Sequence, residues 1–168
     1  KFTVSFNSSE QLASKSVNVE NNGIDLGGTS ELKSSTAYTN TYLYTIPAGE
    51  FSNYYDVILK ITDTAGNSFN LSAQIGIDTI PPKINDVVPS DGEFINELNP
   101  LIGAEYEDWI GVNASSVVLK VNGIKATNSD GQLYVDDNTI TYTPNGQLED
   151  MKEHTIFLQF SDIVGNIK

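Results

Sequence analysis

Hydrophobic residues along the chain mostly alternate with polar ones, in short runs that Gly, Asn, Asp, Ser and Pro separate. Alternation with a period of two places side chains on opposite faces of a strand, and turn-forming residues between the runs are typical of a sandwich of antiparallel sheets. Helical periodicity is scarce, so the pattern predicts an all-β fold. Strands are expected at Phe2–Phe6, Val17–Val19, Tyr42–Ile46, Tyr55–Ile61, Phe69–Ile75, Ile84–Val88, Leu101–Tyr106, Val117–Val121, Leu133–Tyr142 and Thr155–Phe160.

The alternation stops at Pro81 and Pro82 and then starts again. Proline has no amide hydrogen for a sheet and favours extended geometry in the preceding residue, so two in succession form a stiff connector between folded segments. A chain of 168 residues is long enough for two small domains. We therefore expect domains at residues 1–78 and 79–168.

The two halves resemble each other. A shift of about 100 positions lays Phe2–Phe6 on Ile102–Tyr106, and a shift one position shorter lays Asp56–Asn67 on Thr155–Asn166. Strands and turns that match at one period indicate a tandem repeat of one domain. We therefore expect the two halves to superpose as the same sandwich. Three inward-facing residues, Val57, Leu59 and Ile61, should overlay Ile156, Leu158 and Phe160.

The repeat is out of phase with the ends of the sequence. Nothing in the first copy matches Lys83–Val88, and nothing in the second copy matches Phe69–Ile77. The first domain is therefore expected to lack its first strand and the second domain its last strand. Unpaired strand edges invite pairing, so we expect flanking sequence or a neighbouring molecule to supply the missing strands.

Composition excludes several classes of function. The net charge is -13, from 22 acidic and 9 basic residues, and every basic residue is Lys. Nucleic acids and anionic lipids need a basic surface, so neither is expected as a partner. No apolar run is long enough to span a bilayer, and any targeting or anchoring segment is expected outside these residues. The absence of Cys excludes disulfides and thiolate sites.

Catalytic motifs are missing as well. His154 is the only His, with no Ser or Cys partner in a motif, and there is no Gly-rich phosphate loop. We expect His154 to be a structural residue at the start of a strand. The sequence therefore predicts no enzyme.

A distinctive run, Asp63–Asn67 (DTAGN), precedes a strand and then Ile77–Pro82 (IDTIPP). This arrangement resembles the repeat signature of bacterial Ig-like (Big-type) domains of large prokaryotic cell-surface proteins. Asp162–Asn166 repeats its first half, and Glu107–Val117 resembles a loop and strand of the same kinds of domain, including those of archaeal surface-layer proteins. The resemblance spans nearly the whole chain. It implies an all-β fold of two tandem immunoglobulin-like antiparallel β-sandwiches, at an extracellular cell surface.

The DTAGN run also has a physical interpretation. Asp accepts amide hydrogen bonds within a tight hairpin, while Gly and Asn tolerate positive φ before the next strand. Asp63 and Asp162 are therefore expected to be turn residues. Tyr55 stands where Ig-like sandwiches often have a corner tyrosine, and His154 takes that place in the second copy.

Four acidic residues are candidates for a metal site at the joint between the domains. In an Ig topology, the entry of a domain lies at the same end as its second-to-third-strand loop and its last hairpin turn. This geometry would gather Asp78, Glu107, Asp108 and Asp162. Oxygen ligands from separate loops suit Ca²⁺, which would stiffen the linker. Plain acidic surface is the competing interpretation.

Two alternatives stay open. Trp109, with Tyr134 or Tyr142, would face a glycan if the chain were a carbohydrate-binding accessory module of a secreted hydrolase, although a lone Trp more often covers its own core. A pilus-like subunit completed by strand donation would account for the missing strands. Three possible glycosylation acceptors occur, at Asn7, Asn70 and Asn113.

The preferred hypothesis is a non-enzymatic structural repeat module of a prokaryotic cell-surface protein. It would act in a surface-layer lattice or as an adhesin stalk or spacer. Its partners would be neighbouring Ig-like domains of the same chain or lattice.

Overall fold

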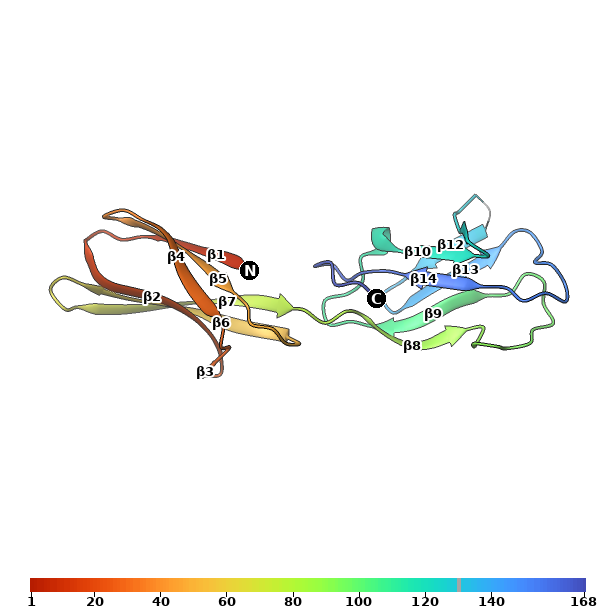
Figure 1. The fold of residues 1–168 in the computed structure, drawn as a ribbon, viewed down its shortest axis with the longest axis horizontal. Coiled ribbons are helices and arrows are strands. Elements are labelled where there is room, and N and C mark those ends of the chain that lie inside the picture. Colours follow the sequence, from red (N-terminus) through yellow and green to blue (C-terminus); the bar gives the residue numbers. More distant parts are fainter. Residues whose placement is uncertain (130) are drawn as a thin grey trace. The chain divides into compact units, whose positions relative to one another are not determined.

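The computed structural model describes residues 1–129 and 131–168, and it separates the chain into two compact units, Lys1–Thr79 and Ile80–Lys168. The boundary follows Thr79, one residue beyond the position expected from the sequence. Each unit has its own sheets and its own hydrophobic core (Figure 1).

The first unit consists of two antiparallel sheets. One has the strand order β1-β5-β4 and the other the order β3-β2-β6-β7. Its strands are β1 (Phe2–Asn7), β2 (Leu12–Asn21), β3 (Ile24–Asp25), β4 (Thr29–Ser35), β5 (Thr39–Thr45), β6 (Ser52–Asp63) and β7 (Ser68–Asp78).

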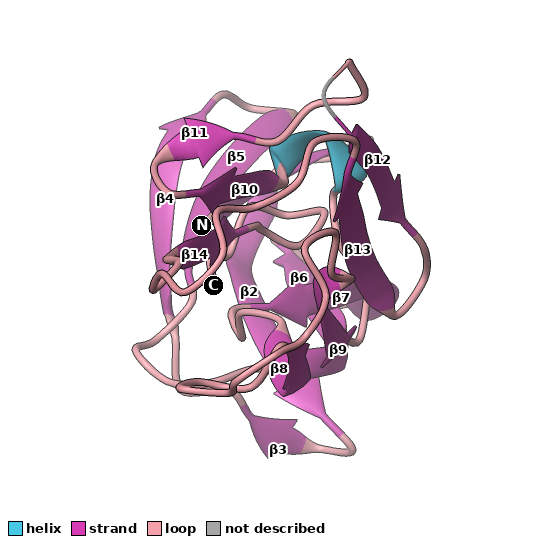
Figure 2. Cartoon of the chain, turned by 90° about the vertical axis from the view of Figure 1, so that its right-hand side faces the viewer, coloured by secondary structure: helices cyan, strands magenta, loops and turns pink. Residues whose placement is uncertain are grey.

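The second unit also consists of two antiparallel sheets, but the strands at the edges of these sheets differ from those of the first unit. Its sheets have the orders β12-β13-β9-β8 and β11-β10-β14. A 3₁₀ turn, η1 (Ala114–Ser116), precedes β10 and is drawn in cyan in Figure 2. The strands are β8 (Lys83–Val88), β9 (Ile102–Glu107), β10 (Val118–Val121), β11 (Ile124–Lys125), β12 (Gly131–Val135), β13 (Thr139–Pro144) and β14 (Ile156–Gln159).

The strand order identifies the fold. In immunoglobulin sandwiches the first, second, fifth and fourth strands form one sheet, and the third, sixth and seventh form the other. The order β8-β9-β13-β12 is the first of these sheets, and β10-β14 belongs to the second, with β11 as a short addition. The prediction of two tandem Ig-like antiparallel β-sandwiches is confirmed. No helix in the part of the chain that the structure describes is long and apolar enough to cross a membrane.

The central strands show why these sequences form sandwiches. Along β5 and β13, every second residue is buried, because one face of each strand meets the opposite sheet. The first core contains Val17, Val19, Tyr42, Tyr44, Val57, Leu59 and Ile77. The second contains Ile102, Tyr106, Val117, Leu119, Ala126, Ile140, Tyr142 and Phe160.

Each unit places a glycine against an inward-facing tyrosine. A Cβ atom on Gly28 would lie 2.3 Å from the hydroxyl oxygen of Tyr44, and one on Gly131 would lie 2.2 Å from the ring of Tyr142. The Gly28 amide donates to the Tyr44 hydroxyl at 3.0 Å. In both sandwiches, therefore, a tyrosine ring lies so close to the backbone that only glycine fits opposite it. The sequence analysis did not predict this feature.

Two strand predictions need correction. The expected strand Leu133–Tyr142 is two strands, β12 and β13, joined by a turn in which the Asp136 amide donates to the Thr139 carbonyl at 2.9 Å. The sequence analysis read through this turn because apolar Val135 and Ile140 flank it. It also missed β4, whose residues are all exposed and therefore show no alternation.

The predicted overlay of the two copies is wrong for one pair of strands: β10 pairs with β14 in a register two residues away from that of β2 with β6. Superposing them without gaps would place Leu119 opposite Ile156, whereas β10 pairs Leu119 with Leu158. In the first unit, β2 runs on through a bulge, while in the second unit η1 takes up residues of the corresponding segment. The pairing slips by two residues, which keeps the same face inward.

Each unit has an open sheet edge. Among the described residues, β1 pairs only with β5 and β14 pairs only with β10. In the second unit the strand that corresponds to β1, which is β9, also pairs with β8. In the first unit the strand that corresponds to β14, which is β6, also pairs with β7. Ile156, the predicted counterpart of Val57, is exposed, because the two-residue slip puts Leu158 in the place of Val57.

Leu59 and Leu71 give a matched test of this sandwich. They lie directly opposite each other on β6 and β7 and share the inner face, yet Leu59 is 7% exposed and Leu71 is 53% exposed. Leu59→Ala should lower the free energy of unfolding by about 2 to 5 kcal/mol, because it opens a cavity in the core. Leu71→Ala should cost less than half as much. Urea denaturation followed by circular dichroism measures both, and equal losses would contradict the assigned faces.

Candidate metal centre

Asp108 lies in the loop that follows β9. Its Oδ1 atom accepts hydrogen bonds from the backbone amides of Ile110, at 3.0 Å, and Gly111, at 2.8 Å. Gly111 has a φ of 92°, which lets the chain turn back under the carboxylate. The sequence Asp108–Gly111 therefore builds a compact loop around one carboxylate oxygen.

Asp162 lies in the turn that follows β14 and is completely buried. Its Oδ1 atom accepts from the backbone amides of Gly165, at 2.6 Å, and Asn166, at 2.9 Å, and its Oδ2 atom accepts from the Asn166 side-chain amide at 2.5 Å. The backbone adds a bond from the Asp162 amide to the Asn166 carbonyl. The prediction that Asp162 is a turn residue is confirmed.

Asp63 occupies the same kind of turn in the first unit. Its Oδ1 atom accepts from the amides of Ala65 and Asn67, and its Oδ2 atom from the Asn67 side chain, each at 2.8 Å. Gly66 and Gly165 have φ values of 92° and 99°. Hydrogen bonds from the side chain and then the backbone of Asn67 favour the ionised carboxylate, so they hold the pKa of Asp63 below its usual value.

Backbone pairing brings the Asp108 loop and the Asp162 turn together. Val112 forms a bridge with Asp162, and the Ile163 amide donates to the Gly111 carbonyl at 3.1 Å. As a result, a carboxylate oxygen of Asp108 lies within 4.8 Å of one of Asp162. This bridge was not predicted, because an isolated pairing between two loops leaves no periodic signal in the sequence.

The pair has the chemistry of a partial cation site. Two carboxylates at this distance repel each other unless a cation or hydrogen-bond donors compensate them. Oxygen ligands on turns that are themselves fixed suit Ca²⁺, which takes six to eight of them.

The other two predicted ligands stand at the ends of strands rather than in these two loops. Glu107, at the end of β9, is exposed and accepts a hydrogen bond from Lys83 at 2.8 Å, and this bond lowers the pKa of Glu107. Asp78 ends β7 in the first unit, where it pairs with Ser52. Within the second unit, the structure therefore brings together Asp108 and Asp162.

The exposure of three aromatic side chains tests the hypothesis that the chain binds a glycan. Tyr142 is 5% exposed and belongs to the core of the second unit, so its proposed role in facing a glycan is wrong. Trp109 and Tyr134 are 42% and 62% exposed. The structure also exposes all three possible glycosylation acceptors, Asn7, Asn70 and Asn113.

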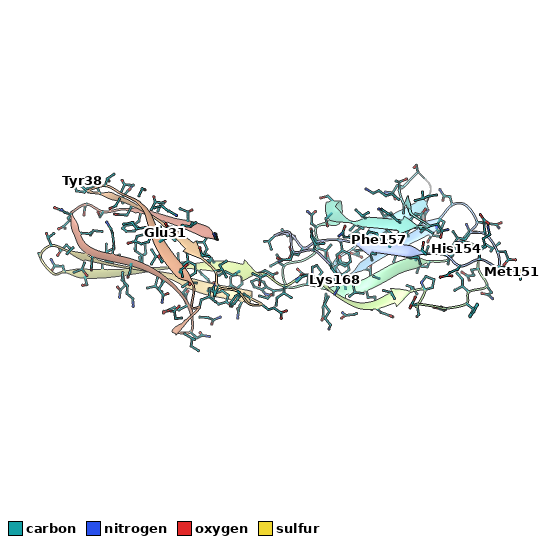
Figure 3. The ribbon with its side chains drawn as sticks, in the orientation of Figure 1. Glu31, Tyr38, Met151, His154, Phe157 and Lys168 are labelled. Carbon is teal, nitrogen blue, oxygen red and sulfur yellow. The ribbon has the colours of Figure 1, made fainter. Side chains whose placement is uncertain are left out.

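His154 and Tyr55 are both tied into their own units. His154, labelled in Figure 3, hydrogen-bonds through its ring nitrogens to the Asn122 side chain and the Glu149 carbonyl, each at 2.9 Å. The Asn122 side chain also accepts from the Thr155 amide at the start of the strand. The ring of Tyr55 packs edge-on against Phe51. His154 therefore fixes the entry to β14.

No family model and no curated protein matches this sequence. Among solved structures, the chain is similar to titin domains A168-A170, with 11% sequence identity and a TM-score of 0.43, over 98% of this chain and 63% of that one. It is also similar to the titin Ig tandem domains A164-A165, with 12% identity and a TM-score of 0.34, over 96% and 91%.

A third similar structure contains the titin domains z1z2 in complex with telethonin, with 14% identity and a TM-score of 0.34, over 97% of this chain and 82% of that one. The chain spans less than two thirds of the A168-A170 structure. The Ig-like fold rests on the strand order of the two units rather than on these likenesses.

The Asp63 turn predicts a pH dependence. Because folding lowers the pKa of Asp63 below the unfolded value of 3.8, ionised Asp63 stabilises the first unit above that pH. This stability should be lost as the pH falls through the lower, folded pKa. Asp63→Asn should therefore destabilise the unit at about pH 7 and lose most of this effect at about pH 2.

Urea denaturation of the wild type and Asp63→Asn at both pH values measures the difference. Glu10→Gln, a change at an exposed loop residue, is the control. A gap between wild type and Asp63→Asn that stays constant with pH would contradict the assigned role.

Proposed function

We propose that the chain is a non-enzymatic structural repeat module of a prokaryotic cell-surface protein, in a surface-layer lattice or as an adhesin stalk or spacer. The observation that carries the proposal is that one sandwich plan is built twice in succession. Both copies share the tyrosine facing a glycine and the Asp-x-x-Gly-Asn turn. Repetition of a self-contained unit gives length, which is the property that a spacer needs.

The functional groups support a structural role. His154 fixes the start of a strand, and the carboxylates of Asp63 and Asp162 close turns. The resemblance of the two Asp-x-x-Gly-Asn runs to bacterial Ig-like repeats supports a place at the cell surface, outside the cell. The partners would then be neighbouring Ig-like domains of the same chain or lattice.

The proposal includes calcium as a stiffening ion. Asp108 and Asp162 supply carboxylate oxygens from two loops that are fixed to each other by backbone pairing. Ca²⁺ bound to Asp108 and Asp162 would hold these two loops together and stabilise the second unit.

Single-molecule force spectroscopy of the whole chain tests both parts. A structural module should resist force, with one unfolding event per unit and a gain of about 30 nm in contour length each time. With millimolar Ca²⁺, the second unit should unfold at a higher force than in chelator, because a ligand that binds only the folded state stabilises it. Asp108→Asn should remove this response.

Asp91→Asn, a change at an exposed loop carboxylate, is the matched control and should keep the calcium response. Monovalent salt at equal ionic strength should not replace calcium. Absence of two resisting events would contradict the structural role. Two events without a calcium response would contradict the calcium part alone.

A further inference from the structure

The two units contain the same dipeptide in the same kind of turn. Asn22–Gly23 joins β2 to β3, and Asn122–Gly123 joins β10 to β11. Both asparagines have a φ of 51°, the two glycines have φ values of 79° and 81°, and all four residues are exposed. Asn-Gly suits a two-residue hairpin turn, because both residues tolerate positive φ. The two turns are therefore a matched pair, and differences between them come from their surroundings.

The side chain of Asn122 is held at both of its polar atoms. Its Nδ2 atom is hydrogen-bonded to the Nδ1 atom of His154 at 2.9 Å, and its Oδ1 atom accepts from the Thr155 amide at 3.0 Å. The backbone amide of Asn122 also donates to the Thr155 carbonyl at 2.8 Å. The carboxamide is therefore fixed to the residues that precede β14 and not to its own turn.

The side chain of Asn22 lacks these restraints. The strand registers make Tyr54 the counterpart of Thr155. The Tyr54 amide donates to the Asn53 side chain at 2.7 Å, so the contact that holds Asn122 is not repeated. Within the part of the chain that the structure describes, no hydrogen bond involves the Asn22 carboxamide. It is therefore free to turn toward the backbone nitrogen of Gly23.

We propose that Asn22 is a site of spontaneous deamidation, and that its hydrogen bonds protect Asn122 from the same reaction. The deprotonated backbone nitrogen of Gly23 attacks Cγ of Asn22, the Cγ–Nδ2 bond breaks, and the amide leaves as ammonia. Water then opens the resulting succinimide ring. Opening at Cγ gives aspartate, and opening at the backbone carbonyl carbon gives isoaspartate, whose peptide link runs through the side chain. Water is the only reagent consumed.

The geometry of the two turns decides their relative rates. Glycine has no Cβ atom to hinder the approach to its nitrogen. A Cβ atom on Gly23 or on Gly123 would meet nothing within 4 Å, so both turns are equally open. Ring closure depends on bringing Cγ against this nitrogen in the right orientation. At Asn122 two hydrogen bonds must break first, which should slow the reaction roughly tenfold or more relative to Asn22.

The reaction changes the edge of one sheet. It adds a negative charge to a turn that is followed by Asp25, which pairs with Glu20. Isoaspartate also adds a backbone carbon to the hairpin, so the pairing of β3 with β2 should be lost. β3 is the edge strand of its sheet, and β2 keeps its pairing with β6. The first unit should therefore stay folded after the modification.

Peptide mapping by mass spectrometry of the whole chain, incubated at mildly alkaline pH, tests the proposal. Trypsin cleaves after Lys, so Asn22, Asn122 and the remaining Asn-Gly pair at 145–146 fall in three different peptides. The exchange of an amide for an acid should accumulate faster at Asn22 than at Asn122, by roughly tenfold or more. The chain unfolded in guanidinium chloride supplies the intrinsic rate of each site, which corrects for the different preceding residues.

Two variants test the protective role of the hydrogen bonds. His154→Ala should raise the rate at Asn122 severalfold and leave the rate at Asn22 unchanged, because Nδ2 of Asn122 loses its partner. Glu153→Gln, a change at the exposed neighbouring residue, is the matched control and should alter neither rate. Circular dichroism verifies that both variants are folded.

Three results would overturn the proposal. The first is an equal rate at Asn22 and Asn122 in the folded chain, after division by the rates in the unfolded chain. The second is the absence of product at Asn22 in the folded chain when the unfolded chain has reacted. The third is an unchanged rate at Asn122 in folded His154→Ala, because the hydrogen bond to His154 would then give no protection.

Discussion

Each unit is held together by side chains that alternate along the strands and meet between two sheets. This packing requires that every inward-facing side chain has a strand of the opposite sheet above it. Where that condition holds, as at Val19, Tyr44 and Ile140, the side chains are almost completely buried. Burying a large apolar side chain contributes roughly 1.5 to 3 kcal/mol, so the central strands supply most of the stability. Where the condition fails, at Phe69 and Leu71, this contribution is only partly obtained.

Hydrogen bonds to an Asp side chain in one turn of each unit stabilise the fold in addition to this packing. Asp63, in the turn after β6, and Asp162, in the turn after β14, each close their turn by accepting backbone and side-chain amides. In the second unit the turn is also covered by the loop after β9, through the bridge between Val112 and Asp162. The same four-residue spacing therefore makes an ordinary turn in one unit. In the other it places a buried carboxylate next to Asp108, where a cation would be favourable.

The sequence predicted those parts of the fold that leave a periodic pattern. Alternation located β5 and β6, because one face of each is buried, and β1, whose inward face is partly buried. It failed for β4, which is exposed on both faces, and at the turn between β12 and β13, which apolar residues flank. The two-residue slip between β10 and β14 was not predictable, since η1 leaves no such pattern. Asp108 and Asp162 were found from topology, whereas the engagement of Glu107 by Lys83 depends on a bulged register that the sequence does not reveal.

The central claim is that the two units are one sandwich in which, among the described residues, β8 lies beside β9 in the second unit and no strand lies beside the outer edge of β1 in the first. Native-state amide hydrogen exchange measures this directly, because an amide that points to an open edge exchanges faster than one paired within a sheet. The account predicts alternating fast and slow amides along β1, and slow exchange on both sides of β9 where β8 pairs with it. Uniform slow exchange along β1 in the isolated chain would contradict it.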